Sequence, residues 1–303
     1  MNSLRRTGIV LALGTAVISG VSVFVNSYGV RAFADATVYT TAKNVVAALV
    51  LALVVTTRAT GARLTRPPSR RQWWALGVVG LLGGSIPFVL FFEGLSRASS
   101  GGAAVIHKTL VLWVAVLAVA LLKERLQWGH WLAIGLLLVG QLGLAGGRLP
   151  SLGSAELMIL AATAMWSVEV VVAKRLLGSL SSWIVGLARM GLGSLALLAW
   201  LLVRGDLAAL TALTWTQLGW VLTTGLLLAG YVATWFAALK RAQAVDVTAV
   251  LVLAVPITAT LDAAVKGTDL GPQLGWLTFL VIGGALAAAL GWGTRPRALP
   301  AGA

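Results

Sequence analysis

The sequence of 303 residues contains no cysteine and few acidic residues. The absence of cysteine excludes disulfides, thiolate metal sites and cysteine nucleophiles. Only 9 residues are Asp or Glu, and charged residues make up 11% of the chain, whereas soluble domains carry about a quarter. So few polar residues cannot cover the surface of a soluble protein of this length.

Apolar residues are abundant instead. They form 59% of the chain, and the mean hydropathy is +0.93, which is typical of membrane proteins. The 23 Lys and Arg residues give a formal net charge of +14. No basic run is interleaved with aromatic residues on a polar face, so we expect no nucleic-acid partner. The excess of cations is better interpreted as a signal of orientation in a lipid bilayer.

Ten apolar runs reach the length of about 20 residues that a membrane-spanning helix needs. Arg5 and Arg6 precede the first run, and Ala32-Phe33-Ala34 resembles a signal-peptide cleavage site, but the run exceeds the ~7–15 residues of a signal peptide. We therefore interpret it as the first span. The predicted spans are 8–30, 36–57, 73–95, 102–122, 128–147, 153–173, 183–203, 216–239, 245–265 and 272–292.

The distribution of cations predicts that both termini are cytoplasmic. With that orientation, cytoplasmic segments hold three times as many Lys and Arg residues as the opposite side, which favours a multi-pass protein of the cytoplasmic membrane. The cytoplasmic set is Arg5, Arg6, Arg58, Arg63, Arg66, Arg70, Arg71, Lys123, Arg125, Lys174, Arg175, Lys240, Arg241, Arg295 and Arg297. The opposite set is Arg31, Arg97, Arg148, Arg204 and Lys266.

The chain also resembles itself. A shift of 144 residues places Leu126 on Leu270, and a shift of 146 places Lys43 on Arg189. Because each half has an odd number of helices, the second half enters the membrane from the other side, as in many secondary transporters. We therefore expect an all-α membrane protein of ten helices in two inverted repeats. The predicted units are a first five-helix repeat at 1–148, a second at 153–293 and a short cytoplasmic tail at 294–303.

The segment Leu121-Leu122-Lys123-Glu124-Arg125-Leu126, followed by Gly135 and Gly140, resembles the EamA-type permeases of the drug/metabolite transporter superfamily. The second half echoes it with Pro256-Ile257 and Gly267-Thr268-Asp269-Leu270, although Leu112 stands opposite Pro256. The resemblance implies transport of small molecules, commonly export, driven by gradients. The sequence has no G-x-x-x-x-G-K loop, so nothing favours ATP hydrolysis.

Ionisable side chains inside the bilayer cost ~2.5–3.5 kcal/mol each and are expected to face the protein interior. Glu169 lies in an otherwise apolar span and resembles the membrane carboxylate of the small multidrug resistance proteins, which share this superfamily. It is a candidate proton or substrate site. The alternative is a permanent ion pair with Arg189 or Lys43.

Further candidates are cationic. Lys43, with Asn44 beside it and Tyr39 one turn earlier, could face a substrate carboxylate or phosphate, or form an ion pair. His107 and Lys108 are adjacent and point about 100° apart on a helix, so we expect at least one to face the pore. A packed, hydrogen-bonded histidine is the alternative.

Two tryptophans and two prolines complete the predicted site. Trp166 and Trp113 are candidates to line a pocket for flat or apolar substrates. Pro87 and Pro256 are expected to break their helices, and the freed backbone groups could line a cavity or act in gating. We expect no metal and no cofactor.

We therefore predict a secondary-active exporter of small organic metabolites, such as amino acids or other zwitterions and anions, working by alternating access. Its expected partners are the substrate and the lipid bilayer, with protons as a candidate coupling ion, and it could be a monomer or a homodimer. A proton-coupled exporter of lipophilic cationic drugs is the alternative, and a non-transporting membrane scaffold a distant one. We do not expect an enzyme, because the chain has no H-E-x-x-H and no G-x-S-x-G motif.

Overall fold

The computed structural model describes residues 2–57, 67, 69–95, 97, 100–147 and 153–293, and its regular elements there are all helices. In the first half they are α1 (Asn2–Gly29), η1 (Val30–Ala32), α2 (Ala36–Thr56), α3 (Arg70–Gly84), α4 (Ile86–Leu95), α5 (Ser100–Lys108), α6 (Leu110–Leu122) and α7 (Trp128–Leu144). In the second half they are α8 (Ser154–Leu176), α9 (Ser182–Arg204), η2 (Leu207–Leu210), α10 (Trp215–Arg241), α11 (Ala244–Leu251), α12 (Ala254–Lys266), η3 (Gly271–Gln273) and α13 (Leu274–Gly293).

Nine helical segments of the described chain are long and apolar enough to cross a membrane. The shorter apolar helix α7 has 17 residues and occupies the place expected for the fifth span. At 1.5 Å per residue it is about 26 Å long, near the lower limit for crossing the hydrocarbon layer. The predicted spans are thus found as helices, but the predicted tail at 294–303 lies outside the described residues.

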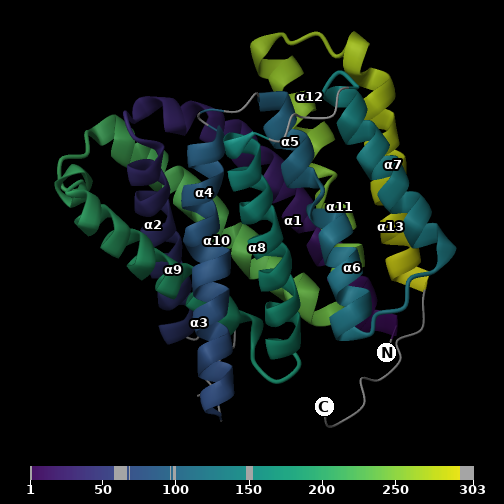
Figure 1. Ribbon diagram of the computed structural model, residues 1–303, viewed down its shortest axis with the longest axis horizontal. Coiled ribbons are helices and arrows are strands. Elements are labelled where there is room, and N and C mark those ends of the chain that lie inside the picture. The colour runs from purple at the N-terminus through teal and green to yellow at the C-terminus, as the bar shows by residue number, and fades with distance from the viewer. Residues whose placement is uncertain are drawn as a thin grey trace.

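Successive spans run in alternating directions between two faces (Figure 1). At the first, which we call the terminal face, the start of α1 meets the end of α13, because the Arg6 guanidinium lies 5.3 Å from the centre of the Trp292 ring. At the other, the far face, Arg204 at the end of α9 pairs with Asp35 before α2 at 2.6 Å. Five passes carry the first half from the terminal face to the far face, so the second half starts there and is inverted.

Three spans are interrupted (Figure 1). Two interruptions, at Ser85 between α3 and α4 and at 252–253 between α11 and α12, lie just before Pro87 and Pro256. The third, at Thr109 between α5 and α6, has no proline. There the Thr109 hydroxyl donates to the Ile106 carbonyl at 2.6 Å, and such side-chain bonds compete with the helical pattern and bend helices.

The two halves do not match at one of these breaks. The 144-residue shift places Pro87 on Tyr231, and α10 runs without interruption through Tyr231 for 27 residues. The third span of the first half is therefore bent, while its counterpart in the second half is a continuous helix.

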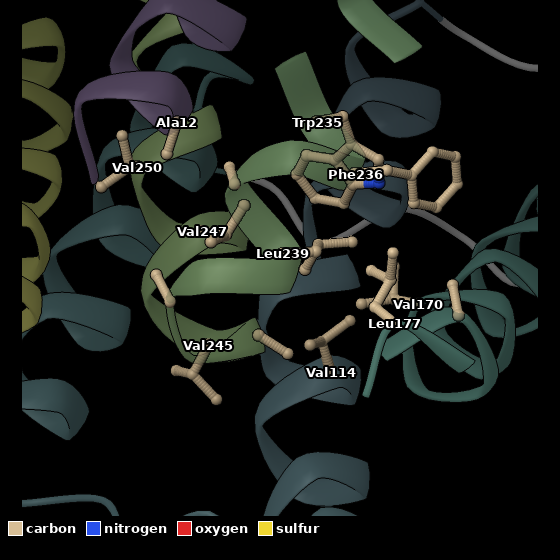
Figure 2. Packing of buried hydrophobic residues seen from close by; sticks show 14 of the residues in the cluster. Ala12, Val114, Val170, Leu177, Trp235, Phe236, Leu239, Val245, Val247 and Val250 are labelled. Atoms are coloured by element: carbon tan, nitrogen blue, oxygen red, sulfur yellow. The ribbon is translucent and has the colours of Figure 1, made fainter. Parts of the chain in front are cut away.

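The halves share one apolar core. Figure 2 shows Trp235, Phe236 and Leu239 of α10 together with buried residues of both halves. The other labelled members of this cluster are Ala12, Val114, Val170, Leu177, Val245, Val247 and Val250. At one crossing the backbones themselves touch. A Cβ atom on Gly193 of α9 would lie 2.6 Å from the Cα atom of Gly84 in α3, so these helices approach closely only because both residues are glycine.

Candidate functional site

The break between α3 and α4 leaves a carbonyl group inside the protein without its helical partner. Pro87 has no N–H to donate to the Gly83 carbonyl four residues earlier. Side chains of the second half supply the missing donors, because Trp166 Nε1 lies 3.3 Å and Arg189 Nε 3.2 Å from the Gly83 oxygen. The next carbonyl, of Gly84, accepts from Asn44 Nδ2 at 3.3 Å. The predicted residues Pro87, Trp166, Arg189 and Asn44 thus meet at one place.

Glu169 lies at the same place. Its side chain packs against Gly83, since a Cβ atom there would lie 2.7 Å from Glu169 Cγ. The Glu169 residue is 1% exposed, and its Oε1 atom is 4.0 Å from Arg189 Nε, which is the outer limit of an ion pair. Glu169 Oε1 and Arg189 Nη1 have no hydrogen-bond partner within the described residues. The pair is therefore loose, with spare hydrogen-bonding capacity on both partners.

An aromatic cluster connects His107 to this centre. The ring of Trp166 contacts Phe88, Phe91 and His107, with centroids 5.4, 5.6 and 5.0 Å away. The His107 ring also lies 5.1 Å from Phe91, and its Nδ1 atom is buried without a partner in the part of the chain that the structure describes. The imidazole thus packs among aromatic rings and keeps one nitrogen unused.

Lys43 lies apart from Glu169 and is held by α1. Its Nζ atom donates to Asn26 Oδ1 at 2.9 Å, and the Tyr39 hydroxyl donates to the same oxygen at 2.7 Å. The ammonium also lies 5.0 Å from the centre of the Tyr39 ring. Among the described ion pairs, none joins Lys43 to Glu169. Sequence reasoning missed Asn26, whose signal was a polar amide inside the apolar first span.

Lys108 lines a cavity of about 300 Å³ near the far face. Asp262 of α12 lines the same cavity and pairs with Lys266 at 2.6 Å. For Lys108 no ion pair or hydrogen bond is found among the described residues. The other lining residues are Val23, Ala254, Val255, Thr258, Ala259, Thr268, Leu270 and Gln273. Asp262 therefore belongs to the wall of this cavity.

Trp113 and Pro256 occupy the edges of this arrangement. Trp113 on α6 is 40% exposed, and its Nε1 atom donates to Thr109 Oγ1 at 3.1 Å. Pro256 follows two cavity-lining residues, Ala254 and Val255, on α12. No group of three or more His, Asp or Glu side chains able to hold a metal ion occurs within the described residues.

An all-helical chain with inverted halves, interrupted spans and ionisable side chains at the contact between the halves defines a multi-pass membrane protein of the two-repeat type. The chain belongs to the EamA-like transporter family, whose pattern it matches twice, at residues 6–146 and 153–290. It is therefore a membrane transporter of the drug/metabolite type.

A comparison with solved structures agrees on the fold. One crystal structure of a protein is 18% identical and superposes with a TM-score of 0.77 over 93% of this chain and 98% of its own. At that identity the similarity shows a shared fold alone. No curated protein matches the sequence significantly.

Proposed function

We propose that this protein is a secondary-active transporter of the cytoplasmic membrane that exports small zwitterionic or anionic metabolites, such as amino acids, by alternating access. The observation that carries the proposal is that Lys108 and Asp262 line one cavity. A zwitterion needs one cationic and one anionic contact, and this cavity offers both. Its volume, about 300 Å³, lies at the lower end of the range for small-molecule sites.

The two charges differ in how readily they accept a ligand. Lys108 has no ion-pair partner among the described residues, so its ammonium group can bind a substrate carboxylate directly. Asp262 already pairs with Lys266, but both side chains are about one third exposed (30% and 34%). Exposed pairs of this kind are worth little, about 0–1 kcal/mol, so a substrate ammonium can replace Lys266.

The distribution of cations supports the proposed orientation. If the terminal face is cytoplasmic, the cavity near the far face opens away from the cytoplasm. At the terminal face the structure describes Arg5, Arg6, Arg70, Arg71, Lys123, Arg125, Lys174, Arg175, Lys240 and Arg241, and at the far face Arg31, Arg97, Arg204 and Lys266. The remaining predicted cations, Arg58, Arg63, Arg66, Arg148, Arg295 and Arg297, lie outside the described residues.

A thermal-shift screen of the purified protein tests the proposal, because a ligand that binds only the folded state raises the melting temperature. The probes are amino acids, organic anions, nucleosides and lipophilic cations, each at about pH 5.5 and pH 8, on either side of the titration range of histidine. We expect zwitterions to stabilise the protein and Lys108→Met and Asp262→Asn each to abolish that effect. Arg97→Gln, an exposed change at the same face, is the matched control and should preserve it. Failure of every zwitterion and anion to stabilise the wild-type protein would contradict the proposal.

A second candidate function is proton-coupled export of lipophilic cations. It is favoured by the buried Glu169 carboxylate, which has a spare oxygen and packs at Gly83, the residue whose carbonyl accepts from Trp166. The aromatic cluster around Trp166 is relevant because aromatic faces attract cations. In that case lipophilic cations alone would stabilise the protein, more strongly at pH 8, and Glu169→Gln would remove the effect.

A further inference from the structure

A buried charge network closes the terminal face. Arg5 of α1 donates to Asp246 Oδ2 at 2.6 Å, and His130 of α7 places Nε2 3.2 Å from Asp246 Oδ1. The Asp246 and His130 side chains are 0% and 2% exposed. Asp246 lies in the first turn of helix α11 of the second half, whereas both of its partners belong to the first half. The network therefore fastens the two halves together at this face.

The hydrogen bonding of His130 fixes how it contributes. Its Nδ1 atom accepts the backbone N–H of Gln127 at 3.0 Å, so the neutral imidazole carries its proton on Nε2. Nε2 lies 3.2 Å from Asp246 Oδ1, within ion-pair distance but without the geometry of a hydrogen bond. One carboxylate oxygen of Asp246 is therefore hydrogen-bonded by a guanidinium from α1, and the other lies close to an imidazole from α7.

A second layer surrounds the same turn between α10 and α11. The carboxylate of Glu124 accepts from the backbone amides of Ala244 and Val245 at 2.8 and 3.4 Å, so it caps α11 where the helix dipole favours a negative charge. Burial raises the pKa of Glu124, and these two hydrogen bonds oppose the rise. From α8, Lys174 Nζ donates to the Ala242 carbonyl at 2.5 Å.

Among the described residues, the far face has no buried equivalent of this network. The 144-residue shift places Glu124 on Thr268, His130 on Leu274 and Asp246 on Gly102, none of which can ionise. Thr268 instead lines the cavity. The far face does have an ion pair between the halves, Arg204 with Asp35, but those side chains are 35% and 33% exposed. The contrast between the faces is therefore one of burial, because the Arg5, Asp246 and His130 side chains are 6% exposed or less.

We infer that the Arg5–Asp246–His130 network stabilises the closed terminal face and so biases the resting transporter toward the state whose cavity opens at the far face. The inference rests on alternating access, which is part of the proposed function. In an inverted repeat the two open states are built from related packing, so a buried charge network at one face, set against a partly exposed ion pair at the other, makes their free energies unequal.

Cysteine labelling tests the inference cleanly because the chain has no cysteine of its own. Ala12→Cys is the reporter for the terminal face, since Ala12 lies two turns beyond Arg5 on α1 and is 1% exposed. Ala259→Cys is the reporter for the cavity. Each is combined with Asp246→Asn in detergent or lipid without added substrate, and labelling by a membrane-impermeant maleimide is followed over time.

We expect Asp246→Asn to raise the labelling rate of the terminal-face reporter by about tenfold or more and to lower that of the cavity reporter, because the two faces open alternately. A second variant, Arg5→Gln, removes the cationic partner of Asp246 and should change the two labelling rates in the same directions. Arg204→Gln, which breaks an ion pair at the far face, is the matched control and should not raise labelling of the terminal-face reporter. Exposed Arg125→Cys reports any general change in reactivity.

Two results would overturn the inference. Unchanged labelling at both reporters would show that the network does not set the balance of states, and increased labelling at both would show that the variants only loosen the fold. Because no substrate is added, neither result depends on the identity of the metabolite. A wild-type protein that no zwitterion or anion stabilises, but whose two reporters respond in opposite directions, would contradict the proposed substrate and leave the network intact.

Discussion

Arg189 donates to the carbonyl group that Pro87 leaves without a helical partner. The two residues belong to different halves of the chain, so a backbone defect in the first half is satisfied by a side chain of the second. Trp166 donates to the same oxygen, and Glu169 packs beside it. The bent span is thus coupled to the only buried glutamate of the described bundle that faces an arginine.

Pro87→Ala should weaken this coupling. The substituted alanine would have an N–H able to donate to the Gly83 carbonyl, in competition with Arg189 and Trp166. We expect the span to straighten and the balance of transport states to shift by about 0.5–2 kcal/mol, seen as a changed transport rate in proteoliposomes with a nearly unchanged melting temperature. Leu81→Ala, at an exposed position of α3, serves as the control. Equal transport by Pro87→Ala and wild-type protein would argue against a role for the bend.

Glu169→Gln tests the proton part of the mechanism. The change keeps the volume of the side chain but removes its titration, so a transporter coupled to protons through Glu169 should lose the pH dependence of its transport. Substrate uptake into proteoliposomes between about pH 5.5 and pH 8 measures this. The exposed Glu93→Gln variant should retain the wild-type profile. Wild-type transport by Glu169→Gln at every pH would rule out Glu169 as the coupling group.

The substrate role predicted for Lys43 requires its ammonium group to leave Asn26. Asn26→Asp should hold Lys43 in an ion pair and weaken the binding of anionic ligands by about tenfold, which corresponds to about 1.4 kcal/mol. Asn26→Ala removes the same hydrogen bond without adding a charge and should leave anion binding in place. Isothermal titration with the ligand found in the thermal screen distinguishes the two variants. Identical affinities would mean that Lys43 is structural.

Asp35 at the far face offers a test of stability. Its carboxylate caps α2 by accepting from the Thr37 amide at 2.5 Å and pairs with Arg204. Asp35→Ala should cost about 0.5–2 kcal/mol, the usual value of an N-cap. Asp35→Asn keeps the cap and loses only the partly exposed ion pair, so its cost should be about 0–1 kcal/mol. Chemical unfolding at neutral pH compares them.

The interactions of Asp35 also predict how the stability of the protein depends on pH. Burial raises the pKa of Asp35, but hydrogen bonds from Arg204 and from the Thr37 and Val38 amides outweigh that effect and place the pKa below its ordinary value. The resulting stability is fully present above the unfolded pKa of about 3.9 and is lost as the pH falls through the lower folded pKa. The difference between Asp35→Asn and wild-type protein should therefore shrink as the pH falls below about 4. A difference that stays constant there would contradict the assignment.

Much of the fold could be predicted because hydropathy and charge report directly on the bilayer. The predicted span 183–203 differs from α9 by one residue at each end, and the repeat follows from residue pairs such as Leu126 and Leu270. The break at Thr109 could not be predicted, because it arises from a side-chain hydrogen bond and not from proline. For the uninterrupted helix α10, the only signal in the sequence is that the 144-residue shift places Tyr231, and not a proline, on Pro87.

The candidate site was predictable only in part, because a sequence shows which charges are buried but not which of them meet. Glu169 and Arg189 do lie together, whereas Lys43 is turned toward Asn26 on another helix. Asp246 was overlooked because a charge near a helix start usually faces water, and its burial depends on Arg5, which is 241 residues away in the sequence. Whether the predicted residues bind substrate stays a prediction.

The contact between Gly84 and Gly193 has a mechanical consequence. At most helix crossings, side chains of one helix sit in hollows of the other, and rotation requires them to climb out. Here backbone lies on backbone, between a helix of the first half and one of the second, so no side chain interlocks the two helices at this point. The crossing lies one residue from the Gly83 carbonyl that accepts from Arg189 and Trp166, so any rotation of one helix against the other at this point would act directly on those two hydrogen bonds.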